Sequence, residues 1–136
     1  MARFLIDTNH LRVALRPVSE FRARLQRLNA RGLRFRTSIP VLCEVEVSIQ
    51  QSPKQDRIYR VMKRVLDFAR IWPLDPELAR IFAQTWLELR DKSRALSHVD
   101  ITLAALARQY QATILTTDRD FEALPDIRTE NWLEKP

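Results

Sequence analysis

Short apolar segments alternate with longer segments of helical periodicity along this chain, and this alternation restricts the fold more than any other feature. Four segments are too short for helices and are either apolar or alternate apolar with other residues, as strands do: 3–6, 33–37, 70–74 and 112–115. Between them, apolar residues recur at helical spacing over 21–28, 41–49, 58–66, 78–89 and 97–107. Strands separated by helices are typical of α/β proteins, so we expect a mostly parallel sheet.

Helix-capping residues support these boundaries. Ser19, Ser38, Asp75 and Ser97 each precede a predicted helix, and Pro40 lies in the first turn of one of them. We also expect a short helix over 11–15, an exposed-edge or half-buried strand over 33–37, and a final strand that includes Ile127. A length of 136 residues suits one domain, 1–136.

The composition excludes several classes of protein. Gly32 is the single glycine, so a P-loop or a dinucleotide-binding fingerprint is not possible. Cys43 is the single cysteine, which rules out an internal disulfide and a multi-cysteine zinc site. No apolar run is long enough to span a membrane, and Asp7 comes too early for a secretory signal, so we expect a cytoplasmic protein.

The net charge of +6 indicates an anionic partner, with nucleic acid as the first candidate. Most of the excess is arginine, whose planar fork suits phosphate better than lysine does. A soluble protein that is merely rich in arginine is an equally good explanation of the charge alone.

Four acidic residues occupy special positions in the predicted layout. Asp7 and Asp118 each follow a predicted strand, and the carboxyl ends of parallel strands are where ligands bind in open sheets. Asp100 lies in the first turn of the predicted helix after Ser97, and Glu44 lies in a largely apolar helix. Clustered carboxylates favour Mg²⁺ or Mn²⁺, which can activate water and orient a phosphate.

Each of these residues also has a purely structural explanation. Asp7 and Asp118 suit helix or turn caps, and Asp100 stands three residues after Ser97, as in a capping box. Glu44 is harder to explain in this way, because a buried carboxylate needs a partner and no Lys or Arg occurs between Arg36 and Lys54.

Four motifs, in this order and spacing, resemble those of PIN-domain ribonucleases, specifically the VapC-type toxins of type II toxin–antitoxin systems. They are Phe4-Leu5-Ile6-Asp7-Thr8-Asn9, the segment 37–45 around Glu44, the segment 97–107 around Asp100, and the segment 112–121 with Thr-Thr-Asp at 116–118. The resemblance covers nearly the whole chain. One departure is Ser48, which stands where the family often has a glycine four residues after the glutamate.

The resemblance implies a three-layer α/β/α sandwich and Mg²⁺-dependent cleavage of RNA, with Mn²⁺ as a substitute for Mg²⁺. It further implies a cognate VapB-like antitoxin and a homodimer. It assigns the acidic roles to Asp7, Glu44, Asp100 and Asp118, with support from Asn9 and Thr116 and with Asp120 as a second candidate for the fourth acid. We further expect Arg12 and Arg119 to bind phosphates beside the site.

Several alternatives remain at this point. One is an interaction protein whose activity has decayed, although the complete acidic set argues against it. A nucleic-acid-binding protein would use the basic surface without catalysis, and an RNA-processing enzyme would cleave RNA without being a toxin. A different metal-dependent phosphate enzyme, such as a DNA nuclease or a phosphatase, would use the same carboxylates on another substrate.

Overall fold

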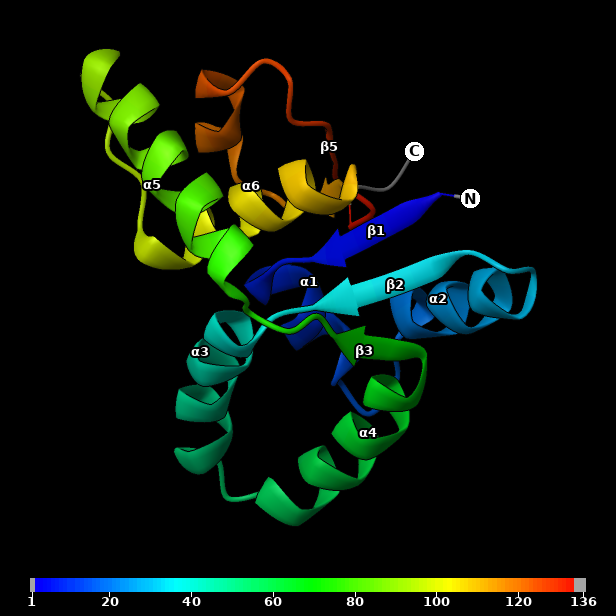
Figure 1. The fold of residues 1–136 in the computed structure, drawn as a ribbon. Coiled ribbons are helices and arrows are strands. Elements are labelled where there is room, and N and C mark those ends of the chain that lie inside the picture. The colour runs from blue at the N-terminus through cyan, green and yellow to red at the C-terminus, as the bar shows by residue number, and fades with distance from the viewer. Residues whose placement is uncertain (1, 134–136) are drawn as a thin grey trace.

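The computed structural model describes residues 2–133, which form six α-helices, a short 3₁₀ helix and five strands (Figure 1). In chain order, the elements are β1 (Arg3–Ile6), α1 (Thr8–Ala14), α2 (Glu20–Ala30), β2 (Arg34–Thr37), α3 (Ile39–Gln50), α4 (Gln55–Phe68), β3 (Ala69–Ile71), α5 (Pro76–Asp91), α6 (His98–Tyr110), β4 (Thr113–Leu115), η1 (Arg119–Ala123) and β5 (Thr129–Glu130).

The five strands form one parallel sheet in the order β3-β2-β1-β4-β5. Helices α2 and α4 pack on one face, while α6, with α5 beside it, lies on the other (Figure 1). The protein is therefore a three-layer α/β/α sandwich, as the alternating pattern of the sequence predicts.

Aromatic side chains fill the layer between the sheet and α2. The rings of Phe4 and Phe35, which pair in register on β1 and β2, stack with centroids 5.5 Å apart. Trp132 lies 5.0 Å from Phe4 and 5.8 Å from Phe35, and Phe21 of α2 meets its edge. The segment near residue 132 thus completes a core that begins in the first strand.

The predicted capping residues all begin helices. Ser19, Ser38, Asp75 and Ser97 are the N-caps of α2, α3, α5 and α6, and each side chain accepts a hydrogen bond from a backbone N–H in the first turn. These bonds satisfy donors that have no partner within the helix, which explains why the boundaries can be read from the sequence.

Of the two expectations for the strand over 33–37, an exposed edge or a half-buried strand, the structure confirms the second, because β2 alternates exposed or half-buried residues with buried ones and lies between β1 and β3. Two expectations need correction. Ile127 precedes the last strand: its N–H donates to the carbonyl of Leu124 in a turn, and β5 begins only at Thr129. The first helix begins at Thr8 rather than near Leu11, because Asp7 caps it.

The carboxyl ends of β1 and β4 meet at one edge of the sheet. Ile6 pairs with Leu115, and the N–H of Asp7 donates to the carbonyl of Leu115 at 3.1 Å. The segments 7–9 and 116–118 therefore leave the sheet side by side. Within residues 2–133 no helix is long and apolar enough to cross a membrane.

Candidate active site

Asp7 is the most buried of the predicted acidic residues, with 8% of its surface exposed. Its Oδ1 accepts the N–H of Thr8 at 2.6 Å, which makes it the N-cap of α1. Its Oδ2 accepts the hydroxyl of Thr116 at 2.7 Å. Asp7 therefore caps a helix and also joins the ends of two strands, so its structural role and its predicted functional role coexist.

Asp118 lies next to Asp7 through a shared threonine. The Oγ1 of Thr116, which donates to Asp7, also accepts the N–H of Asp118 at 3.0 Å. The Oδ1 of Asp118 accepts the N–H of Asp120 at 2.8 Å and so caps η1. Thr116 thus links two of the predicted acids, Asp7 and Asp118. Asp120 is exposed, and the hydrogen bond found for it is donated by its backbone N–H, not made by its carboxylate.

Glu44 reaches the same place from α3. It is half-buried, and its Oε2 accepts the hydroxyl of Thr8 at 3.0 Å. Its neighbour Glu46 instead accepts the Tyr59 hydroxyl at 2.7 Å. Thr8 is a site residue that the sequence reasoning missed, although its place directly after Asp7 in the first motif was a usable signal.

Asp100 is half-buried in the first turn of α6. Its N–H donates to the Oγ of Ser97 at 3.1 Å, as the capping-box explanation requires. The negative charges of Asp7, Asp118 and Glu44 nevertheless act on its carboxylate and raise its pKa. The four predicted acids therefore come from four different elements or their ends and lie close enough to repel one another.

Burial and mutual repulsion both disfavour the charged forms of two of these acids. Burial raises the pKa of Asp100 to about 6, with contributions from the charges of Asp7, Asp118 and Glu44, against a hydrogen bond with Ser97 that lowers it. Burial and the charges of Asp118 and Glu44 also raise the pKa of Asp7, although the bonds from Thr116 and Thr8 oppose this. A cluster with raised carboxyl pKa values is typical of a functional site.

The remaining predicted site residues surround this cluster. The Nδ2 of Asn9 donates to the Oγ1 of Thr117 at 3.1 Å, which gives a second link between the ends of β1 and β4. Arg12, one turn along α1, donates to the Oδ1 of Asn9 at 3.3 Å. Arg119 is exposed immediately after Asp118. Thr117 was not predicted, because its partner Asn9 lies 108 residues away.

The chemistry of the donors fits a hard divalent cation. The four acids supply only oxygen ligands, and none of the ion pairs found within residues 2–133 involves any of them. In the arrangement of residues 2–133, no three acidic, histidine or cysteine side chains converge closely enough to hold an ion together. Repulsion favours such a spread arrangement, and a cation between the acids would offset both the repulsion and the burial of charge.

An apolar hollow of about 240 Å³ opens between α1, α3 and α4, and its lining includes Val45, the residue after Glu44, but none of the four acids. Its floor includes Leu15, Val45 and Ile58, and its rim carries basic residues: Arg12, Arg16, Lys54 and Arg57. Ser48, which departs from the family pattern, lines this hollow rather than the acidic cluster. We refer to this hollow, with its apolar floor and its basic rim, as the α1–α3–α4 hollow.

Comparison with known proteins identifies the family and agrees with the fold. The family model described as "PIN domain" matches residues 4–127. A protein named Ribonuclease VapC2 from Haemophilus influenzae is 26% identical over 98% of this chain and 100% of its own length.

Two solved structures share the fold over almost their whole length. A chain in the crystal structure of VapBC2 from Rickettsia felis, bound to a DNA fragment from the promoter, superposes with a TM-score of 0.83 at 20% identity, covering 96% of this chain and 98% of that one. A chain in the structure of DNA-bound VapBC from Salmonella typhimurium gives 0.82 at 25% identity, covering 97% and 99%.

Proposed function

The chain belongs to the PIN domain family, and on this basis we propose that it is a magnesium-dependent endoribonuclease, the VapC-like toxin of a toxin–antitoxin pair. The observation that carries the proposal is the group of four acids at the carboxyl edge of the sheet, whose charges act on one another and which have no basic partner among the described ion pairs. The similarity to a protein named as a ribonuclease supports RNA as the substrate.

In this proposal Asp7, Asp100 and Asp118 hold Mg²⁺, with Mn²⁺ as a substitute, and Glu44 binds it directly or through water. When bound, the ion supplies a Lewis acid that activates water and neutralises charge on the phosphate. Thr8 and Thr116 keep the carboxylates in place through the hydrogen bonds described above.

Arg12 bonds Asn9 of the first motif and Arg119 directly follows Asp118, and we propose that both bind flanking phosphates of the RNA. The bond between Arg12 and Asn9 keeps the Arg12 guanidinium at the edge of the site. Arginine suits this role because it presents several donors in one plane and stays charged at any physiological pH.

The direct test measures cleavage of RNA by the purified protein with Mg²⁺, with Mn²⁺ and with EDTA. We expect cleavage with either ion and none after chelation. Asp118→Asn should abolish cleavage, while Asp120→Asn, two residues away and exposed, serves as the matched control and should retain most of it. Undiminished cleavage after thorough chelation would exclude the metal mechanism, and the opposite order of the two variants would make Asp120 the fourth acid.

We also propose that a VapB-like antitoxin binds this protein. The solved structures named above contain VapBC pairs, and the α1–α3–α4 hollow offers an apolar floor that includes Val45, the residue after Glu44. A tail that fills the hollow with apolar side chains could place a basic side chain among the carboxylates and compete with the metal.

The toxin role is tested in cells. We expect expression of the protein alone to arrest growth, and expression together with the neighbouring small gene to restore it. Asp118→Asn controls for the burden of expression. Harmless expression of a protein that cleaves RNA when purified would favour an RNA-processing role without toxicity.

Exposed apolar side chains on α3, β3 and α5 support the proposal of a homodimer. They include Ile39, Ile71, Trp86 and Leu87, together with Leu74 in the segment between β3 and α5, all more than a third exposed. Because two copies could cover such side chains together, sedimentation of the purified protein should give twice the chain mass. A monomer at micromolar concentration would contradict this.

A further inference from the structure

Four arginines lie on one face of the sheet, away from the acidic cluster. Arg3 of β1 pairs in register with Arg34 of β2, and Arg36 of β2 pairs with Arg70 of β3. Side chains alternate along a strand, so all four lie on the face opposite the buried Phe35. We call these residues the arginine face.

The arginine face is not neutralised by acids. None of the ion pairs found within residues 2–133 includes any of its members. Arg3 donates to the carbonyl of Tyr110 and Arg36 to that of Phe35, so the polar contacts described for them are with neutral groups. Partial burial and the charges of the other three arginines lower the pKa of Arg36. Asp67 lines a hollow next to Arg34, Arg36 and Arg70, and no ion pair joins it to them.

An aromatic pair stands next to the arginine face. The rings of Trp72 and Tyr110 stack at 4.3 Å with an interplanar angle of 17°. Together with Arg3, Arg34 and Arg36 they line a hollow of about 190 Å³. Both aromatic side chains are half-buried, so part of each remains accessible beside the guanidinium groups.

We propose that the arginine face, with Trp72 and Tyr110, binds a single-stranded segment of RNA at a second site. This inference rests on the proposed function, because it extends the contact with the RNA substrate. Guanidinium groups bind phosphates and stack on bases, and an aromatic side chain beside them is typical of surfaces that hold single strands. Arg3 lies four residues before Asp7, which is about 13 Å along an extended strand, so one RNA molecule can reach both sites.

Protection of the sheet edge does not explain the arrangement. Charged side chains on edge strands prevent pairing with other sheets, and this would account for Arg70 on β3. Arg3, Arg34 and Arg36, however, lie on β1 and β2, which have partners on both sides. An acidic peptide would satisfy the charges, but it would not use the aromatic pair.

The test compares RNA binding by two double variants that remove equal charge. Arg34→Gln with Arg70→Gln changes two exposed members of the arginine face for which no side-chain hydrogen bond is described. Arg27→Gln with Arg60→Gln is the matched control, on exposed positions of α2 and α4 across the sheet. Both are made in Asp118→Asn protein, and binding of a labelled single-stranded oligouridine of about 15 nucleotides is measured in EDTA at several salt concentrations.

We expect the arginine-face variant to bind the oligouridine on the order of tenfold more weakly, and its salt slope to fall by about 1.4, the value for two phosphate contacts on a single strand. The control should change neither quantity by a comparable amount. Replacing the same two arginines by lysine should restore the salt slope, because lysine keeps the charge.

Equal loss in both variants would mean that only net charge matters, and this would overturn the proposal. Unchanged RNA binding, combined with weaker binding of oligoglutamate, would make the surface a site for an acidic protein instead. Unchanged RNA binding with new aggregation would show that the arginines protect the edge of the sheet from pairing with other sheets. Because cleavage is measured separately in wild-type protein, a failure here while RNA is still cleaved leaves the proposed function in place. If the wild-type protein neither cleaves nor binds RNA, the proposed function fails and the inference fails with it.

Discussion

At the scale of single residues, the hydroxyl of Thr116 makes two hydrogen bonds that link two of the acids in the site. It donates to Asp7 and accepts from the backbone of Asp118, so one oxygen atom connects two of the four acids. Thr8 does the same on the other side, with its N–H on Asp7 and its hydroxyl on Glu44. Two threonines thus position three carboxylates.

Thr116→Val tests this role, because it keeps the shape of the side chain and removes the hydroxyl. We expect RNA cleavage to fall roughly 10- to 100-fold and the concentration of Mg²⁺ needed for half-maximal rate to rise, as for other groups that orient metal ligands. Thr113→Val, half-buried at the start of β4, the strand that Thr116 directly follows, is the control and should leave both unchanged. Equal Mg²⁺ dependence in the two variants would show that Thr116 has only a structural role.

Asp100→Asn separates capping from metal binding. Charge on Asp100 is disfavoured by burial and by the other three acids, so removing it should raise the Tm of the metal-free protein by roughly 2–5 °C. Mg²⁺ should raise the Tm of the wild-type protein and have little effect on the variant, which should also lose cleavage. A lower Tm with near-normal cleavage would show that Asp100 serves only in the capping box and does not bind the metal.

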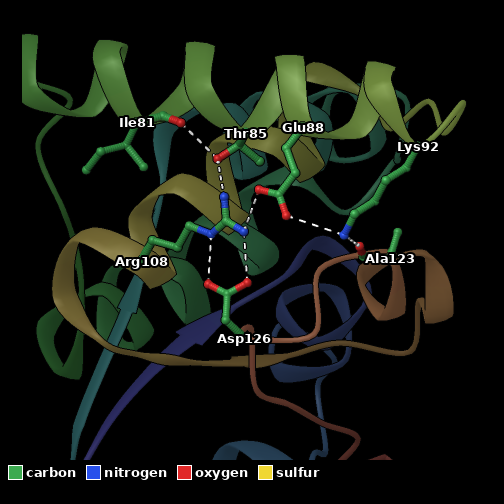
Figure 2. A network of polar contacts seen from close by, with 7 residues as sticks. All are labelled: Ile81, Thr85, Glu88, Lys92, Arg108, Ala123 and Asp126. Atoms are coloured by element: carbon green, nitrogen blue, oxygen red, sulfur yellow. Dashed lines mark hydrogen bonds and ion pairs between the residues drawn. The ribbon is translucent and has the colours of Figure 1, made fainter.

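At the scale of elements, one network of charged side chains joins α5, α6 and the chain after η1 (Figure 2). The guanidinium of Arg108 donates to Asp126 through Nε at 2.9 Å and Nη2 at 2.8 Å, and to Thr85 at 3.0 Å. Its Nη2 also lies 2.9 Å from Glu88, which pairs with Lys92. The segment that follows Asp118 is thereby tied to the helix that carries Asp100.

Arg108→Met should therefore destabilise the protein by about 2 kcal/mol, lowering the Tm by roughly 6–10 °C, because it leaves acids of the network without their partner. Arg90→Met is the matched control: the Arg90 side chain is 60% exposed, against 20% for Arg108, its ion pair within the described part of the chain is with its neighbour Asp91, and its guanidinium lies 6.0 Å from the ring centroid of Trp86. Thermal unfolding of the two variants should differ clearly, and equal Tm values would show that the network contributes little.

The helices were easier to predict than the last strand. Ser19, Ser38 and Ser97 act within three residues of themselves, so their effect is visible in the local sequence. The strand β5 has only two residues, and its position depends on pairing with β4 rather than on its own pattern. Ile127 has the apolar character of a strand residue but lies in a turn that packs against the core.

The site divides in the same way. The four acids stand out because each follows a strand or opens or interrupts an apolar helix. The bond from Thr8 to Glu44 depends on how α1 and α3 pack, and no periodicity reports that contact. The sequence also could not distinguish a cap from a metal ligand at Asp7 or Asp118, because the same carboxylate is placed to serve as both.

At the scale of the whole molecule, His10 connects α1 to the far end of the described chain. Its ring is fully buried, its Nε2 accepts the N–H of Trp132 at 3.1 Å, and no partner is found for its Nδ1 within residues 2–133. Burial lowers the pKa of His10 from 6.5 to about 4. The imidazole is therefore neutral in the folded protein at physiological pH.

This shift predicts loss of stability in acid. The unfolded chain takes up the His10 proton near pH 6.5, and the folded protein takes it up only near pH 4. The free energy of unfolding is therefore unaffected by His10 above pH 6.5 and decreases as the pH falls from 6.5 toward 4. The loss is at most about 3 kcal/mol. The raised pKa values of Asp7 and Asp100 act in the opposite direction.

His10→Gln isolates this contribution, because glutamine can still accept from Trp132 and does not titrate. Denaturant unfolding of both proteins at pH 7 and pH 4.5 should give a wild-type protein that loses more free energy of unfolding than the variant. If the two lose the same amount, protonation of His10 does not limit acid stability.

The order of strands in the sheet has a consequence for synthesis of the chain. The central strand β1 is made first, but its neighbour β4 and the hydroxyl that binds Asp7 come 109 residues later. At ordinary translation speed, that interval is roughly 5–20 s, and the ribosome also hides the most recent residues. During this time Asp7 and Asp118 are not in the same place, so the nascent chain has no assembled acidic site. A protein of the proposed activity would therefore spare the ribosome and messenger RNA that are producing it.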